Sequence, residues 1–321
     1  MLSFVVNSID PAKFAVVSAS IARSVRGATH EVVGIHDARS MCDGYARGLA
    51  RSAGDPVVFC HDDLEILCTD LPARLDRHLA RFDVFGPVGT RKLVSMNWAD
   101  AGAEYLYGAM SGPDPGGRLA TGYFGGATRE VDGIVALEGV FIVASRAAAL
   151  AVGWDDATFD DWHGYDTDFS FRAHLAGWRV GVVLDLPIVH QSAGRRGAGY
   201  ERSRERFAAK HAGRLASDRS GVNLITYVPM ADHDAIRTFF DGGDLAAWHR
   251  ESRLRIDRAR TSPGVRRPAT LMGGGWDPSR ASAGRIDRRA DPPTRNGACP
   301  CGSGRRYKEC HGAAAGGRGP G

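Results

Sequence analysis

The N-terminal part of the chain alternates apolar β-type segments with helical periodicity, and this alternation limits the fold more than any other feature. Residues 3–8 form a short apolar run, residues 11–24 carry apolar side chains at helical spacing, and residues 31–37 form a second apolar run. Strands that alternate with helices indicate an α/β fold with a mostly parallel sheet. The chain has 321 residues, 43% of them hydrophobic, which is enough to bury a full core around such a sheet.

A third apolar run, residues 56–60, follows a helix predicted over 41–53 and leads directly into His61, Asp62 and Asp63. Open α/β sheets bind ligands beyond the carboxyl ends of their strands, so this polar triplet lies where a site is expected. Carboxylate oxygens suit Mg²⁺ or Mn²⁺, which could bridge the acids to a diphosphate. Two adjacent acids after a strand are also common as a helix cap or a solvated turn.

The following residues continue the α/β pattern. We expect, in order, a helix over 71–82, a strand and turn over 82–89, a strand and helix over 137–153, a helix over 166–176, a strand over 178–191 and a helix over 235–253. Residues 112–126 are rich in glycine, so we expect them to lack regular structure and to form a loop on the substrate side.

Six aspartates lie between residues 155 and 168, directly before the helix predicted over 166–176. Asp166 and Asp168 are two residues apart, so at a helix start they point in different directions. One carboxylate can face a cleft as a base, while the other caps the helix or pairs with Arg172 four residues on.

Four blocks in this order resemble the inverting family 2 glycosyltransferases of the GT-A fold. The blocks are the first strand, HDD, LEGVFIVASR and WDDATFDDWHGYDTDFSFRAHLAGW, and the resemblance covers roughly residues 1–215. It implies an α/β fold with a GT-A-like mixed, mostly parallel sheet flanked by helices. It also implies a metal-dependent transfer of sugar from a nucleoside-diphosphate sugar to a hydroxyl of an unknown acceptor (glycan, lipid or protein), with inversion at the anomeric carbon.

The resemblance also implies roles for individual residues. Asp37 would contact the nucleotide base, Asn7 and Ser8 would line the same pocket, and Asp62 would lie near the ribose. Asp63 and His190 would bind Mn²⁺ or Mg²⁺. Glu138 and Gly139 would lie on the acceptor side, and Asp166 would be the catalytic base. Two positions depart from the family pattern. His61 replaces the first acid of the DxD motif, and Tyr165 replaces the glutamate that usually precedes the base.

Other interpretations of these residues stay open. Asp37 could cap the helix that starts at residue 41, His190 could be a packed surface histidine, and Glu138 could pair with Arg146 or another cation. The two departures are also compatible with a catalytically degenerate nucleotide-sugar-binding adapter. Nucleotidyltransferases share the layout, but the glycine-rich basic loop that follows their first strand is missing here.

A second motif lies near the C-terminus, in NGACPCGSGRRYKECHG. Cys299, Cys301, Cys310 and His311 provide three thiolates and an imidazole, the ligand set of a closed tetrahedral zinc site. The segment closely resembles the SEC-C motif, which implies structural Zn²⁺ and docking to a protein or the ribosome. So short a segment has no core and would depend on the metal to fold.

Charge divides the chain into an acidic body and a basic tail. From Arg250 onward there are 16 Lys and Arg against 6 Asp and Glu, a net charge of +10, which leaves −6 for residues 1–249. We therefore predict a glycosyltransferase-like domain over 1–250, a basic disordered linker over 251–296 and a SEC-C motif over 297–313. The basic tail could contact nucleic acid, ribosomes, anionic lipid or an acidic protein, or it could be a solvated linker.

Two further expectations concern a surface loop and the location of the protein. The arginines at 195, 196, 202 and 204 could form a cationic loop that closes over a diphosphate, or a solvated charged helix. The chain has no run of about 20 apolar residues and no secretory signal at its start, so we expect no transmembrane segment. A cytoplasmic location follows, with peripheral attachment to a membrane as a further option.

Overall fold

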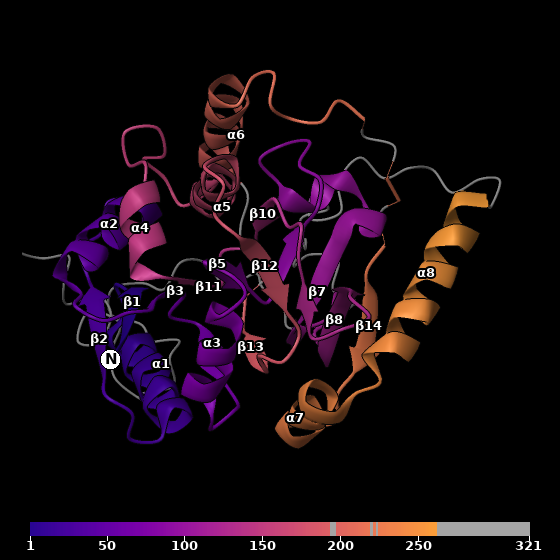
Figure 1. The fold of residues 1–321 in the computed structure, drawn as a ribbon, viewed down its shortest axis with the longest axis horizontal. Helices are drawn as coiled ribbons and strands as arrows, with labels where there is room; N and C mark the ends of the chain where they lie inside the picture. Colours follow the sequence, from indigo (N-terminus) through magenta and orange to yellow (C-terminus); the bar gives the residue numbers. More distant parts are fainter. Residues whose placement is uncertain (193–196, 219–220, 223, 262–321) are drawn as a thin grey trace, which may run out of the picture. The chain divides into compact units, whose positions relative to one another are not determined.

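A seven-stranded sheet organises the first half of the computed structural model, which describes residues 1–192, 197–218, 221–222 and 224–261 (Figure 1). Its strand order is β2-β1-β3-β11-β5-β12-β9. β1 runs parallel to β2 and β3, and β5 runs parallel to β12, whereas β11 and β9 are antiparallel to their neighbours. The α/β architecture with a mostly parallel sheet, predicted from the sequence, is confirmed.

The strands of this sheet are short and mostly buried. Their bounds are β1 (Leu2–Asn7), β2 (His30–Ile35), β3 (Val57–Cys60), β5 (Val84–Gly86), β9 (Glu130–Val131), β11 (Phe141–Ala144) and β12 (Val180–Val183). Every residue of β1, β3, β5, β11 and β12 is buried, as expected for strands covered on both faces.

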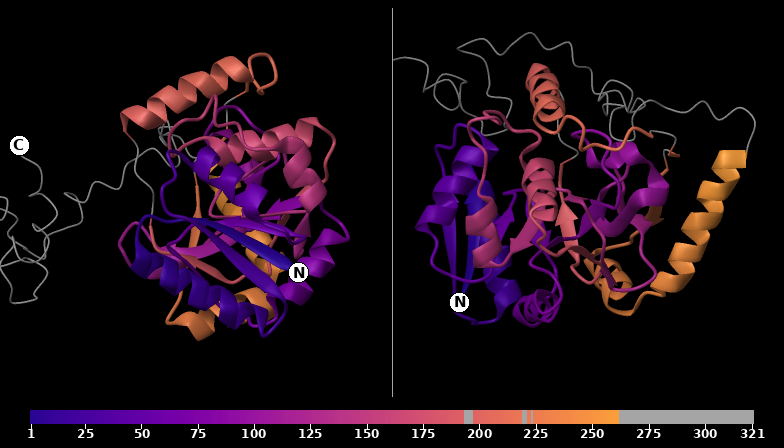
Figure 2. Two further views of the ribbon diagram at one scale, coloured as in Figure 1. Left: turned by 90° about the vertical axis from the view of Figure 1, so that its left-hand side faces the viewer. Right: turned by 45° about the horizontal axis from the view of Figure 1, so that its top comes forward.

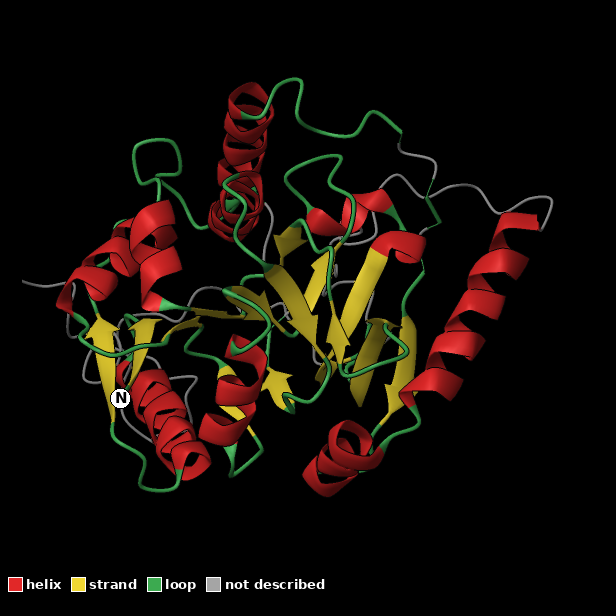
Figure 3. Ribbon diagram, viewed as in Figure 1, coloured by secondary structure: helices red, strands yellow, loops and turns green. Residues whose placement is uncertain are grey.

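Helices cover both faces of this sheet (Figure 3). The helices of the described residues are α1 (Pro11–Val25), α2 (Met41–Arg51), α3 (Leu71–Leu79), α4 (Arg146–Val152), α5 (Tyr165–Leu175), α6 (Ala198–Lys210), α7 (His233–Gly242) and α8 (Leu245–Thr261), with 3₁₀ turns at Trp98–Ala101 and Ala103–Tyr105. Side chains alternate between the two faces along β1. Phe4 and Val6 lie in one apolar cluster with α1 and α3, while Val5 lies in the other with α2, α4 and α5.

A second sheet has the order β10-β6-β7-β13-β4, with β8 paired to β7 and β14 paired to β8. Its strands are β4 (Leu64–Ile66), β6 (Val88–Thr90), β7 (Leu106–Pro113), β8 (Leu119–Gly125), β10 (Ala136–Leu137), β13 (Ile188–His190) and β14 (Thr226–Pro229). α8 contacts β8. It is the orange helix at the C-terminal end of the described residues in Figure 2. No helix of the described segments is long and apolar enough to cross a membrane.

The glycine-rich segment 112–126 forms part of a β-hairpin, so the prediction that it lacks regular structure is wrong. β7 and β8 pair antiparallel, with one register shift between Gly108 and Ala109, and the chain turns between them at Gly117, whose φ is +78°. Glycine suits the hairpin where other backbone approaches it closely: a Cβ on Gly112 would lie 2.5 Å from the His190 carbonyl oxygen.

Two other predicted elements are divided in the structure. The run 178–191 gives β12 and β13, which belong to different sheets. The helix predicted over 235–253 is α7 and α8, separated where Gly243 caps α7 by donating its N–H to the Phe239 carbonyl. α8 continues to Thr261, so the first part of the predicted linker is helical; the rest of the linker lies outside the described residues.

Candidate active site

The register of two strand pairs brings polar segments together at the carboxyl end of β3. Where β11 pairs with β3, the His61 N–H donates to the Val140 carbonyl at 3.1 Å. Where β13 pairs with β4, His190 lies opposite Leu64, the residue that follows Asp63 in the chain. Residues that are more than 100 positions apart in the chain therefore meet at one end of the sheet.

His61, Asp63 and His190 form a cluster of donor atoms that could hold a metal ion. One donor atom from each residue lies within 4.8 Å of the other two. The Asp63 Oδ1 is 3.2 Å from His190 Nε2 and 3.9 Å from His61 Nδ1. His190 Nε2 is buried and makes no hydrogen bond to the described residues. Buried polar atoms usually have a partner. A divalent cation held between this nitrogen and the neighbouring carboxylate oxygen would provide one.

The same three residues have shifted pKa values. Burial, helped by the neighbouring His190, lowers the pKa of His61 to about 4, so its imidazole is neutral at pH 7. Burial opposes charge on His190, but the Asp63 carboxylate outweighs it and raises the His190 pKa. Burial likewise opposes charge on Asp63, yet His190 and Ser192 hold the Asp63 pKa well below its usual value. The cluster thus presents a carboxylate at neutral pH.

Asp166 and Glu138 form a pair of half-buried carboxyl groups next to this cluster. Burial, and secondly the proximity of Glu138, raises the pKa of Asp166 to about 7, although backbone N–H groups of Thr167 and Gly139 act in the opposite direction. Burial also raises the pKa of Glu138, whose Oε2 accepts the Val140 N–H at 2.8 Å. Carboxyl groups with such pKa values are typical of acid–base sites.

Gly139 allows the two segments to approach each other. A Cβ at this position would lie 2.4 Å from the Tyr165 hydroxyl oxygen and 2.7 Å from the Asp166 Cβ. Tyr165 in turn bonds to His61, with 2.5 Å between its hydroxyl oxygen and His61 Nε2. The predicted acceptor-side pair, the predicted base and the polar triplet are therefore in direct contact.

Three of the residues predicted to bind nucleotide lie near the end of β1. The Ser8 hydroxyl donates to Asp62 Oδ2 at 2.7 Å. Asn7 donates its amide to the Met41 carbonyl at 3.2 Å, whereas its buried Oδ1 makes no hydrogen bond to the described residues. A Cβ on Gly44 would lie 2.1 Å from this oxygen, so only glycine fits there.

Asp37 lies apart from these contacts, on the exposed loop after β2, where it pairs with Arg47 at 2.6 Å. The alternative in which it caps the next helix is wrong, because Ser40 is the N-cap of α2. The alternative pairing of Glu138 with Arg146 is also wrong, since the Arg146 side chain bonds to the loop after α2.

Asp168 points away from the carboxyl pair, as predicted for the second acid of the helix start. Its Oδ2 accepts the Arg172 Nε–H at 2.7 Å, and its Oδ1 lies 2.7 Å from Lys210 Nζ and 2.8 Å from His211 Nε2. The other aspartates of this segment that face α6 also pair with its cations. These ion pairs are Asp155 with Lys210, Asp160 with Arg206 and Asp161 with Arg202.

A model of the family described as "Glycosyltransferase like family" matches residues 3–211, a span that contains every contact described above for the polar triplet and the carboxyl pair. The chain belongs to this family. A SEC-C motif matches residues 295–313, which lie outside the described residues. The predicted zinc ligands fall within that match, and comparison with curated proteins gives no match.

Solved glycosyltransferase structures are similar to this family member at low identity. S. aureus TarS 1-349 in complex with UDP-GlcNAc is 14% identical, over 62% of this chain and 60% of that chain, with a TM-score of 0.38. The mannosyltransferase PcManGT from Pyrobaculum calidifontis, in complex with GDP-Man and Mn²⁺, is 11% identical over 82% and 76%, also with a TM-score of 0.38. This chain thus spans three fifths of the length of the TarS structure. At these TM-scores the two structures give no evidence on the function of this chain.

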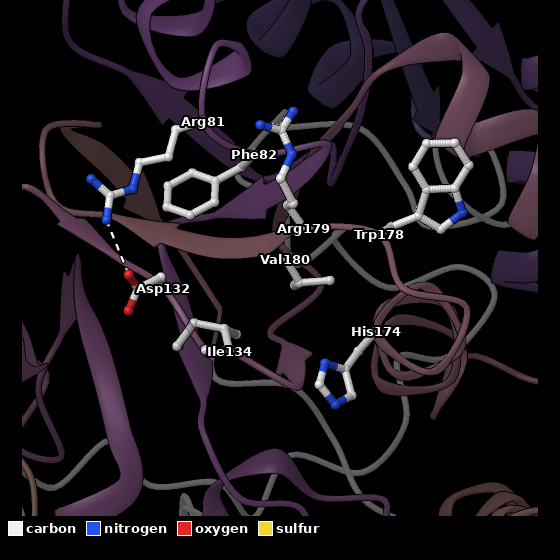
Figure 4. Close-up of a pocket in the computed structure, with 9 residues that line it drawn as sticks. Arg81, Phe82, Asp132, Ile134, His174, Trp178, Arg179 and Val180 are labelled. Carbon is white, nitrogen blue, oxygen red and sulfur yellow. Dashed lines mark hydrogen bonds and ion pairs between the residues drawn. The ribbon is translucent and has the colours of Figure 1, made fainter.

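A separate cavity of about 340 Å³ lies at the other end of α5 (Figure 4). It is lined by Arg81, Phe82, Asp132, Gly133, Ile134, His174, Trp178, Arg179 and Val180. Its cations are paired, Arg81 with Asp132 at 3.0 Å and Arg179 with Asp83 at 2.8 Å. None of the residues predicted to act in this glycosyltransferase-like protein lines the cavity, so it is not the candidate active site.

The predicted basic loop is only partly described. Arg202 and Arg204 lie in α6 and pair with Asp161 and Glu201, as a solvated charged helix would. The arginines at 195 and 196 lie outside the described residues. For these two positions, closure over a diphosphate stays a prediction.

Sequence reasoning missed the partners of the site residues more than the residues themselves. It noted His61 and Tyr165 as two independent departures, but not that they bond to each other across 104 positions. The available signal was that each departure directly adjoins a predicted functional acid, Asp62 or Asp166. It also missed Ser192, which donates to Asp63 and follows a strand whose end was recognised.

Proposed function

We propose that this chain is an inverting, metal-dependent glycosyltransferase that moves a sugar from a nucleoside-diphosphate sugar to a hydroxyl group of a glycan, lipid or protein. The observation that carries the proposal is the Asp166 carboxyl group. It is half-buried, its pKa is raised to about 7, and it directly follows Tyr165, whose hydroxyl bonds to His61 of the metal-type cluster. A general base is most effective when its pKa is near the working pH.

Asp63 and His190 would hold the divalent cation, Mn²⁺ or Mg²⁺. The carboxylate of Asp63 and the buried His190 Nε2, 3.2 Å apart, are donors of the right chemistry for this role. A cation bound there neutralises the diphosphate and makes it a better leaving group. Ser192 supports the arrangement, because it helps to hold the Asp63 pKa below its usual value.

Asp166 then removes the proton from the acceptor hydroxyl. The hydroxyl oxygen forms a bond to the anomeric carbon, the bond from that carbon to the diphosphate oxygen breaks, and the nucleoside diphosphate leaves with the electron pair. A single displacement of this kind inverts the anomeric configuration. Glu138, on the acceptor side, keeps the Asp166 pKa high enough for proton transfer at neutral pH.

The nucleotide would lie along the ends of β1 and β2. Asn7, Ser8 and Asp62 offer an unpaired amide oxygen, a hydroxyl and a carboxylate there. Asp37, which pairs with Arg47 in the structure, would bind the base at the exposed end of this surface. These groups are hydrogen-bonding partners for a base and a ribose.

The test is calorimetric titration of UDP- and GDP-sugars in the presence of Mn²⁺. We expect one nucleotide sugar to bind the natural chain, and to bind Asp63→Asn at least about 10-fold more weakly. Asp132→Asn is the matched control, because it removes an acid from a surface ion pair beside the separate cavity.

Unchanged binding by Asp63→Asn would reject the metal role. Sugar transfer with retention of configuration, seen by NMR of the product, would reject the mechanism, and binding without transfer or hydrolysis would favour the degenerate adapter.

The SEC-C match supports a second, separate proposal for the C-terminus. Three thiolates and one imidazole, from Cys299, Cys301, Cys310 and His311, would bind one Zn²⁺ and form a docking module for a protein or the ribosome. Metal analysis of the full chain should give one zinc per molecule. Cys310→Ser should remove it and leave nucleotide-sugar binding unchanged; a zinc content that is unaffected would contradict the proposal.

A further inference from the structure

The two departures from the family pattern form one hydrogen-bonded unit. His61 and Tyr165 lie in different elements, after β3 and at the first turn of α5, yet their polar atoms are 2.5 Å apart. If the site had degenerated, two independent losses would not be expected to produce so close a contact between the replacing groups. The pair therefore calls for a shared role.

Tyr165 is held firmly enough to orient its partner. Its side chain is only 5% exposed and lies among aromatic rings, with ring centres 5.8 Å from Tyr45 and 6.1 Å from Trp154. Gly139 leaves space for its hydroxyl. A rigid hydroxyl at His61 Nε2 fixes the imidazole plane and turns the other ring nitrogen toward Asp63.

His61 Nδ1 is the nitrogen that remains for a ligand. It lies 3.9 Å from Asp63 Oδ1, and the same oxygen lies 3.2 Å from His190 Nε2. Two donors that are each about 2.1 Å from one ion are roughly 3 Å apart at a right angle and roughly 4 Å apart at a wide angle. Both separations are therefore within the range for ligands that share a cation.

We propose that His61 is a third metal ligand through Nδ1, positioned by Tyr165, and that the resulting set of two imidazoles and one carboxylate selects Mn²⁺ or Co²⁺ over Mg²⁺. This rests on the metal site of the proposed function and specifies its ligands. Imidazole nitrogen suits transition metals, whereas Mg²⁺ requires oxygen ligands and retains its waters. In the metal-bound state His61 donates its Nε2–H to the Tyr165 oxygen, the usual arrangement of a ligating histidine and its hydrogen-bond acceptor.

The experiment measures the metal alone, on the zinc-loaded full chain without nucleotide or sugar. Mn²⁺ binding is followed by electron paramagnetic resonance, and the coordinated imidazole nitrogens are counted by spin-echo modulation. We expect two nitrogens in the natural chain and one in His61→Asp. The ratio of Mg²⁺ to Mn²⁺ dissociation constants should fall at least about 10-fold in His61→Asp, because an oxygen donor replaces nitrogen. His174→Asp, at the far end of α5 in the separate cavity, is the matched control and should match the natural chain.

Tyr165→Phe tests the positioning role. It should weaken Mn²⁺ binding about 10-fold in the natural chain, within the range for a lost hydrogen-bond partner of a metal ligand. In the His61→Asp background it should have no further effect, because Tyr165 acts only through His61. An equal loss in both backgrounds would overturn the positioning role.

The outcome separates this proposal from the proposed function. One coordinated nitrogen in the natural chain, or an unchanged metal preference in His61→Asp, overturns the three-ligand site even if metal-dependent sugar transfer is found. Two coordinated nitrogens with the expected change in preference support the site even if no sugar transfer is detected.

Discussion

Asp166 and Asp168 are two residues apart in the first turn of α5, but their surroundings are opposite. Asp168 is bound by Arg172, Lys210 and His211, which hold its pKa below the usual value although burial opposes this. None of the ion pairs within the described segments includes Asp166, and burial beside Glu138 raises its pKa to about 7. The same carboxyl group is thus stabilised as an anion at one position and destabilised as an anion at the other.

This difference separates a structural acid from the acid that we propose as the catalytic base. The Asp168 anion joins α5 to α6, so its charge contributes to folding. The Asp166 anion is unfavourable in the folded protein, which makes it a proton acceptor near neutral pH. Four predictions test whether the comparison holds.

The largest effect is expected on catalysis. Asp166→Asn removes the proton acceptor without changing its shape, so the rate of sugar transfer should fall about 10²–10⁴-fold. Asp168→Asn is the matched control, and its rate per folded molecule should stay within about 3-fold of the natural chain. Release of nucleoside diphosphate measures both rates. Similar losses in the two variants would remove the distinction between the two acids.

The next effect is on stability, and the two variants should change it in opposite directions. Asp168→Asn removes a buried anion from the partly exposed cations Arg172 and Lys210, so the free energy of unfolding should fall by roughly 3 kcal/mol. Asp166→Asn removes an unfavourable buried anion, so the free energy of unfolding at pH 8 should rise by about 1 kcal/mol. Denaturant unfolding without added divalent cation measures both changes.

The free energy of unfolding should depend on pH in opposite directions through Asp166 and Asp168. The folded Asp166 pKa of about 7 is above its unfolded value, so the folded state binds more protons between pH 4 and 7 and stability falls as pH rises through this range. Asp166→Asn should lack this decline. The folded Asp168 pKa is lowered, so its contribution is present above the unfolded pKa and is lost as pH falls through the folded pKa. A decline between pH 4 and 7 that persists in Asp166→Asn would assign it to another group.

The sequence predicted the elements better than the contacts between them. The βαβ start, the polar end of β3 and the helix with Asp166 and Asp168 follow from short-range periodicity, which residues carry locally. The Asp168–Arg172 pair was also predictable, because it depends on helical spacing. The hairpin over 112–126 was not, since glycine there serves close backbone approach to another strand. Nor was the contact of His61 with Tyr165, which depends on the register of strands that are distant in sequence.

The smallest effect is expected from Glu138, because its replacement changes the pKa of Asp166 while Asp166 itself stays in place. Glu138 raises the Asp166 pKa in addition to burial, so Glu138→Gln should lower that pKa. The transfer rate should rise with pH through the Asp166 pKa in the natural chain, because the base must be deprotonated. In Glu138→Gln the midpoint of this rise should move to lower pH by about half a unit to one unit, since burial remains the larger cause. A pH profile of the rate at saturating nucleotide sugar measures the midpoint. A midpoint that moves to higher pH would show that Glu138 does not act on Asp166 as a neighbouring negative charge.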